Sequence, residues 1–200
     1  YNDAMNDHIT LRDMMCHRTG LPRHDLSWYL FPTTRDSLIQ RIQFQQPTTT
    51  LRTRYQYNNF MFLAQGKAAE KINGKPWEQQ VKEQLFAPIG MTNSSMTANA
   101  LKGNPHLAVP YDLEKDSTLK ILKHYPIEGM GPAGSIYSSV TDMAKWVQTW
   151  IHGGKLNGKE ILPASYVKEA MSGQMISNGN PPDMKRPDIQ FGTYGFAWSM

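Results

Sequence analysis

The stretch RYQYNNFMFLAQG, residues 54–66, places a tyrosine and two asparagines directly before an apolar run. Apolar or small residues occupy most faces of residues 60–72, which predicts a largely buried helix. Asn73-Gly74 predicts its end, because glycine readily takes the left-handed conformation that closes many helices. The three hydrogen-bonding side chains before the run therefore either start this helix or face a substrate.

Tyr57 and Asn59 lie two residues apart, so they share one face only if the backbone there is extended. A shared site predicts extended residues up to Asn59 and a helix that begins at about Phe60. Tyr57 would then lie near the positive helix N-terminus, which favours a phenolate. Tyrosine, with an ordinary pKa of about 10, needs such help to act as a base near neutral pH. Asn59 can donate to and accept from an amide-like substrate. The bland alternative is an ordinary helix cap.

The rest of the chain reads as helix-rich with few strands. Residues 9–17, ITLRDMMCH, predict a short helix in which Thr10 and Asp13 form a capping box. Residues 23–33 and 173–190 are expected to be loops, the second one mobile. Further helices are expected over residues 34–44, 76–86 and 139–151, and strand-like pieces over 106–113 and 194–200. A lone terminal strand needs a sheet, so we expect these residues to be part of something longer.

Composition narrows the function classes. The 200 residues suit one domain, and the net charge of +4 is scattered, so no nucleic-acid partner is expected. No apolar run is long enough to span a membrane. Cys16 is the only cysteine, which excludes an intrachain disulfide and favours a small buried residue over a nucleophile beside His17. The six histidines lack close ligand spacing, so no metal is expected.

Three stretches, in order, resemble the serine β-lactamase and penicillin-binding family, in its branch of class C β-lactamases, D,D-peptidases and related esterases. Residues 57–91 carry a Y-x-N motif, a helix, a glycine turn, a second helix and a P-I-G-M turn. ITLRDMMCHRTGLP is similar to I-T-x-x-x-L-L-x-H-x-S-G-L-P, with Thr19 where serine is usual. GPAGSIYSSVTDMAKW is similar to P-A-G-G-x-x-S-x-x-D-M-A-x-W, with Ser135 at the second glycine.

The resemblance implies a helix-rich α+β fold: the helical lobe and part of the α/β region of a β-lactamase/transpeptidase-like domain across residues 1–200. It implies acyl-enzyme formation on a lactam, amide or ester carbonyl of a small-molecule or peptide substrate, without a cofactor. Tyr57 inherits a part in proton transfer, and Asn59 holds the lysine and the substrate amide. His24 and Gly134 become candidate substrate contacts. Relatives of this type generally work outside the bacterial cytoplasm, so we expect a periplasmic or secreted protein.

The family's S-x-x-K and K-T-G or H-x-G motifs are expected outside these residues. Two S-x-x-K matches, ending at Lys120 and Lys168, follow the Y-x-N motif and so stand in the wrong order. His152 begins an H-x-G match at a predicted helix end rather than on a strand. We reject all three as catalytic. Two alternatives stay open: a non-catalytic binding or structural module on the same fold, and an unrelated helical interaction domain whose Tyr57 and Asn59 point to opposite sides.

Overall fold

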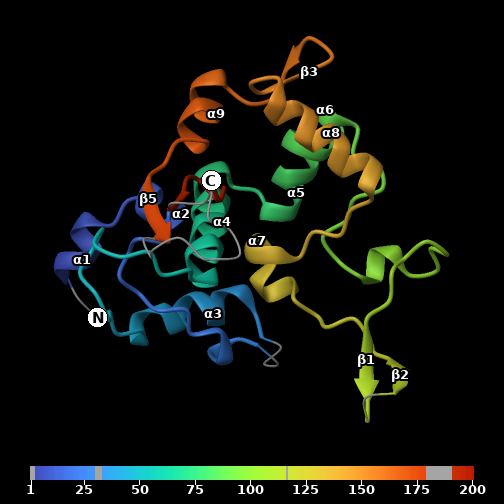
Figure 1. The fold of residues 1–200 in the computed structure, drawn as a ribbon, viewed down its shortest axis with the longest axis horizontal. Helices are drawn as coiled ribbons and strands as arrows, with labels where there is room; N and C mark the ends of the chain where they lie inside the picture. The colour runs from blue at the N-terminus through green and yellow to red at the C-terminus, as the bar shows by residue number, and fades with distance from the viewer. Residues whose placement is uncertain (1–2, 30–32, 116, 179–190) are drawn as a thin grey trace.

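The computed structural model describes residues 3–29, 33–115, 117–178 and 191–200. Helix α4 (Asn59–Asn73) lies at the centre, with α3 (Arg35–Arg41) and α7 (Gly131–Gly134) beside it (Figure 1). Helices α1 (Asp3–His8) and α2 (Leu11–Met15) precede these elements. The 3-10 turns are η1 (Asp25–Ser27), η2 (Ile42–Phe44), η4 (Asn99–Leu101) and η5 (Glu128–Met130).

A second group of helices follows α4 in the chain. Helix α5 (Trp77–Val81) runs through a π-helical segment, η3 (Lys82–Phe86), into α6 (Ala87–Ile89). Helix α8 (Val140–Ile151) packs with β3 (Lys155–Leu156), and α9 (Ala164–Ala170) comes next. The predicted helix over residues 76–86 is therefore correct in place, with one π-helical turn that the pattern did not indicate.

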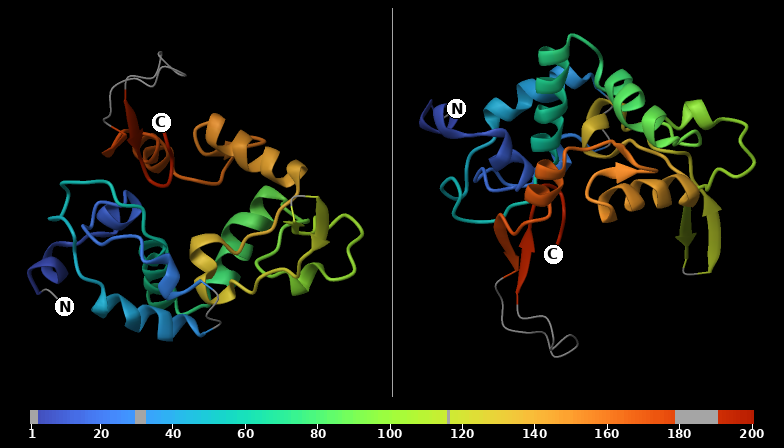
Figure 2. Two further views of the ribbon diagram at one scale, coloured as in Figure 1. Left: turned by 60° about the horizontal axis from the view of Figure 1, so that its bottom comes forward. Right: turned by 90° about the horizontal axis from the view of Figure 1, so that it is seen from above.

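The strands form three separate antiparallel pairs in the described residues. β1 (Tyr111–Glu114) pairs with β2 (Thr118–Ile121), and this hairpin projects from the body of the molecule (Figure 2). β3 pairs with β4 (Lys159–Glu160), and β5 (Met175–Asn178) pairs with β6 (Gly192–Tyr194). β5 occupies part of the stretch predicted to be a mobile loop, so that prediction is wrong for its four residues, while residues 179–190 lie outside the described residues.

The strand predicted over residues 194–200 is also wrong. Only Tyr194 belongs to a strand, and the chain then turns back so that Gly195 N–H donates to the Trp198 carbonyl. Phe196 N–H donates to the Ala170 carbonyl, and the Phe196 side chain packs against Cys16 and its apolar neighbours. This tertiary packing overrides a local pattern of apolar residues that suits a strand.

The apolar interior consists of three clusters. One surrounds the first half of α4, where Phe60 and Leu63 are fully buried. A second lies between η3, α6 and β3, and a third joins Cys16 to Trp150 and α9. Cys16 is fully buried and burial raises its pKa, so the prediction of a structural cysteine is confirmed. Among the described residues, no helix combines the length and the apolarity that crossing a bilayer requires.

Candidate active site

Helix α4 begins at Asn59, one residue before the predicted start. Asn58 is its N-cap, with extended backbone (φ −143°, ψ 113°), and its side-chain oxygen accepts from Phe60 N–H. The same side chain is fully buried and donates to the Pro22 carbonyl (2.7 Å) and to Gln45 Oε1 (3.1 Å). Asn58 thus performs the capping, which leaves the flanking Tyr57 and Asn59 free for other contacts.

Tyr57 packs against the ring of His17. The two ring centroids lie 4.2 Å apart. The guanidinium carbon of Arg23 lies over the phenol ring of Tyr57, 5.1 Å from its centroid. Burial raises the pKa of Tyr57, Arg23 opposes the rise and Asp25 adds to it. The net direction is opposite to the phenolate expected near the helix N-terminus, because removal from water disfavours the charged form of the phenol.

Asn59 is nearly buried, and its side-chain amide donates to Asp25 Oδ1 at 3.0 Å. Asp25 Oδ1 also accepts from Trp28 Nε1 (3.0 Å), and Asp25 Oδ2 forms an ion pair with Arg23. Burial disfavours the Asp25 carboxylate, but these hydrogen bonds outweigh it and hold the pKa of Asp25 below its ordinary value. Tyr57 and Asn59 therefore meet the same Arg23–Asp25 pair and lie on one side, as a shared site requires.

His17, the histidine of the ITLRDMMCHRTGLP match, is fully buried beside Tyr57, although it was not among the predicted site residues. Its Nδ1 accepts from Asn58 N–H at 3.1 Å, so the ring proton sits on Nε2, which has no hydrogen-bond partner among the described residues. Burial and the charge of Arg23 lower the pKa of His17 to about 4. His17 is thus a neutral ring at neutral pH, placed between Asn58 and Tyr57.

The two candidate substrate contacts lie on the surface. His24 is exposed beside Arg23, with left-handed backbone (φ 49°), and its carbonyl accepts from Ser27. Gly134 is exposed at the end of α7, where an added methyl group would meet no heavy atom within 4 Å. Helix α7 packs on α4 at Gly66, about 10 Å along the helix axis from Asn59. The structure therefore places His24 next to the Arg23–Asp25 pair and Gly134 at the exposed end of a helix that contacts α4 through Pro132.

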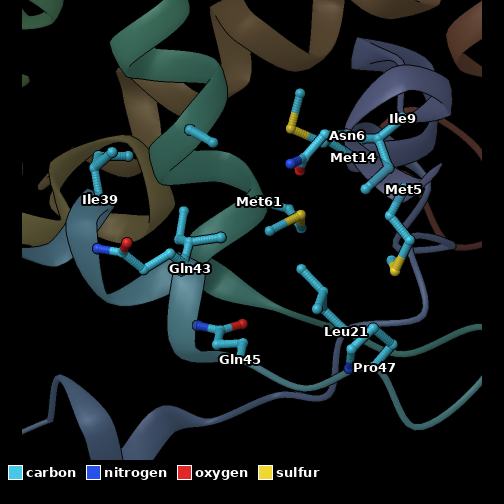
Figure 3. Close-up of a pocket in the computed structure, with 12 residues that line it drawn as sticks. Met5, Asn6, Ile9, Met14, Leu21, Ile39, Gln43, Gln45, Pro47 and Met61 are labelled. Carbon is cyan, nitrogen blue, oxygen red and sulfur yellow. The ribbon is translucent and has the colours of Figure 1, made fainter. Parts of the chain in front are cut away.

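Gln45, whose Oε1 accepts from Asn58, helps to line a pocket of about 420 Å³ (Figure 3). Its wall is mostly apolar and is built from α1, α2, α4 and the α3–η2 segment, with Met5, Met14 and Met61 among its side chains. Gln45 is buried, and its Nε2 has no partner among the described residues. Tyr57 and Asn59 do not line this pocket, so it is separate from the paired site residues.

The three rejected motif matches lie in a turn, on a helix and at a helix end. Ser117 is in the turn between β1 and β2, and Lys168 is an exposed residue of α9. His152 is the C-cap residue of α8, followed by two glycines with left-handed backbone. No cluster of potential metal ligands occurs within the residues that the structure describes.

Comparison with known proteins defines the class. The family profile described as "Beta-lactamase" matches residues 2–199. The structure aligns with the octameric penicillin-binding protein homologue from Pyrococcus abyssi at a TM-score of 0.77 and 19% identity, covering 98% of this chain and 46% of that one. The chain therefore belongs to the β-lactamase family, and its helix-rich α+β structure follows the β-lactamase/transpeptidase fold over most of its length.

Two curated relatives agree with this family membership. The putative penicillin-binding protein PbpX of Bacillus subtilis is 32% identical over 177 residues, 86% of this chain and 41% of that protein. Unguisins hydrolase ungD' of Aspergillus campestris is 28% identical over 168 residues, 80% of this chain and 30% of that protein. The chain spans less than half the length of these relatives. This membership excludes the unrelated helical interaction domain.

Proposed function

We propose that this chain supplies one wall of the site of a serine hydrolase that forms an acyl-enzyme on a lactam, amide or ester carbonyl. Tyr57 takes part in proton transfer, and Asn59 holds the lysine and the substrate amide. The supporting observation is that both side chains reach the Arg23–Asp25 pair at the start of α4. The nucleophilic serine and its lysine are implied by the family resemblance, and no residue of this chain is assigned to them.

The contacts of Asn59 define what its amide offers. Asp25 is ionised and can only accept hydrogen bonds, so the NH₂ group of Asn59 must face it. The Asn59 oxygen then points elsewhere as an acceptor, which suits a lysine ammonium or a substrate N–H. The second N–H of the amide remains for a substrate carbonyl.

Tyr57 is a neutral phenol at neutral pH in the described surroundings, because burial raises its pKa. It can donate its proton to a leaving group, and it can accept one from a serine only when a further cation stabilises its phenolate. Proton transfer by a placed side chain contributes about 10²–10⁴-fold to a rate. We assign a rate contribution of this size to Tyr57.

The test is the intact mass of the native gene product before and after incubation with a reactive β-lactam. An added acyl mass supports the proposal, and Tyr57→Phe should then slow acylation or deacylation by about 10²-fold or more while folding is nearly unchanged. Tyr166→Phe is the matched control, because Tyr166 is a partly buried tyrosine whose pKa burial also raises and which packs in another cluster. Wild-type turnover with Phe at position 57 would refute the role of Tyr57.

The alternative function is a non-catalytic binding or structural module on the same fold. It predicts no adduct under any condition, while the Arg23–Asp25 contacts to Tyr57 and Asn59 are kept. His24 and Gly134 are proposed substrate contacts under either function, and His24→Ala should then weaken binding. A periplasmic or secreted location is a further proposal, which rests on the family resemblance and is tested by fractionation of the native source.

A further inference from the structure

We infer that Arg23 is a positioning residue that links Tyr57 to Asn59, with its guanidinium lying over the Tyr57 ring while its Nε–H holds the Asp25 carboxylate against the Asn59 amide. This inference deepens the proposed function and rests on it for its catalytic meaning. Arg23 and Asp25 flank His24 in the segment LPRHD, where the family resemblance indicates only His24 as a candidate contact. Neither residue was among the predicted site residues.

The first half of the link is the carboxylate. Asp25 accepts from three side chains: Arg23 and Trp28 of its own segment, and Asn59, which is 34 residues away in sequence. Its ionised form fixes which end of the Asn59 amide faces it, because a protonated carboxyl could also donate. Arg23 stabilises that ionised form. Loss of Arg23 would therefore loosen the orientation of Asn59 without touching Asn59 itself.

The second half of the link is the phenol. Five neighbouring groups face Tyr57 from the elements packed around it: Arg23, Asp25, His17, Tyr55 and Tyr194. His17 is neutral at neutral pH, and the two tyrosines carry no charge there. Arg23 is thus the cation of this group, and it offsets part of the effect of burial on Tyr57.

The chemistry of arginine suits both contacts at once. A guanidinium is planar, so its face can lie on an aromatic ring while an N–H in its plane points at a carboxylate. A lysine ammonium keeps the charge but lacks the plane and the fixed fork. The Arg23 side chain is 63% exposed, so replacing it should leave the buried core intact. The contacts of Arg23 can therefore be tested by substituting this residue without unfolding the protein.

The experiment follows the ionisation of two side chains in the native, full-length gene product. Tyrosine labelled with ¹³C at Cζ and aspartate labelled at Cγ are titrated by NMR, with Tyr57→Phe and Asp25→Asn assigning the two signals. Arg23→Gln should raise the pKa of both Tyr57 and Asp25, because a cation is removed from beside each. Arg54→Gln is the matched control, since Arg54 is an exposed arginine three residues before Tyr57, and it should move neither pKa.

Arg23→Lys should give intermediate values, because the charge stays while the planar contact is lost. A rise at only one of the two sites, or at neither, would overturn the link. Full restoration by lysine would overturn the role given to the planar guanidinium. The readout does not depend on turnover: if no acyl adduct forms while both values rise, the proposed function fails and the link stands.

Discussion

Asp13 offers the sharpest test of how the site segment is held in place. Its side chain is fully buried and accepts from Thr10 N–H and Oγ1, from Arg18 Nε (2.7 Å), and from Arg52 Nε and Nη2 (3.0 and 2.9 Å). Burial opposes the carboxylate, but these donors outweigh it and hold the pKa of Asp13 far below its ordinary value. The cluster ties α2 to the segment that leads into Tyr57.

Asp13→Asn keeps the volume, removes the charge and turns one acceptor into a donor that faces other donors. Removing one partner of a buried, hydrogen-bonded ion pair costs about 3–5 kcal/mol. Arg52 is half exposed and regains water, so we expect the low end, about 3 kcal/mol in the free energy of unfolding. Urea unfolding at pH 7, with the slope m unchanged, measures it.

Asp36→Asn is the control for this experiment. Asp36 pairs with Lys67, but its side chain is 70% exposed, so the loss should stay within about 1 kcal/mol. The Asp13 effect should also depend on pH with a definite sign. Its folded pKa lies below the unfolded value of about 3.9, so the stabilisation is complete above that pH and fades as pH falls through the folded pKa. Equal losses for the two variants, or an Asp13 effect that persists unchanged in strong acid, would refute the reasoning.

Two further predictions concern packing and protonation around α4. Gly66→Ala places a methyl carbon 2.2 Å from Pro132 Cγ, so it should lower the free energy of unfolding in urea by about 1–3 kcal/mol. Gly134→Ala meets open space and should change that free energy by no more than about 0.5 kcal/mol. Equal effects of the two variants would contradict the packing of α7 on α4. Because the folded pKa of His17 is about 4, below the unfolded value of about 6.5, the free energy of unfolding should fall by about 3 kcal/mol as pH drops between these values. His17→Gln should flatten that fall, and parallel curves for variant and wild type would show that another group titrates.

Local signals predicted the ends of helices well. The capping box of Thr10 and Asp13 and the left-handed glycine after α4 are both present. Each depends on residues within four positions of one another, so the sequence carries the whole interaction. The predicted start of α4, Phe60, is one residue too late, because Asn58 rather than Asn59 supplies the cap.

Contacts between distant segments were not predictable in the same way. The sequence shows Arg23 two residues before Asp25, but it does not show that Asn59 meets this pair. Likewise Asp13 was identified as a capping residue, while its ion pair with Arg52 appears only when α2 packs beside the 51–54 turn. The apolar residues of α8 recur at helical spacing, yet Trp150 is buried while Met143, Val147 and Ile151 are exposed. Helical periodicity in a sequence predicts an apolar stripe on one face of the helix, but only the tertiary structure decides which of its residues are buried.

The direction of the Tyr57 pKa constrains the rest of the proposed site. Burial raises this pKa, and Arg23 alone among the cations of the described residues opposes it. A tyrosine that accepts a proton near neutral pH therefore needs a second cation within a few ångströms. The lysine that the family resemblance implies would meet this need if it also reached the free oxygen of Asn59. One cation would then lower the pKa of Tyr57 and donate to Asn59. The proposed function therefore requires that both residues lie on one side and that the ionised Asp25 accepts from the Asn59 amide, which leaves the Asn59 oxygen for that cation.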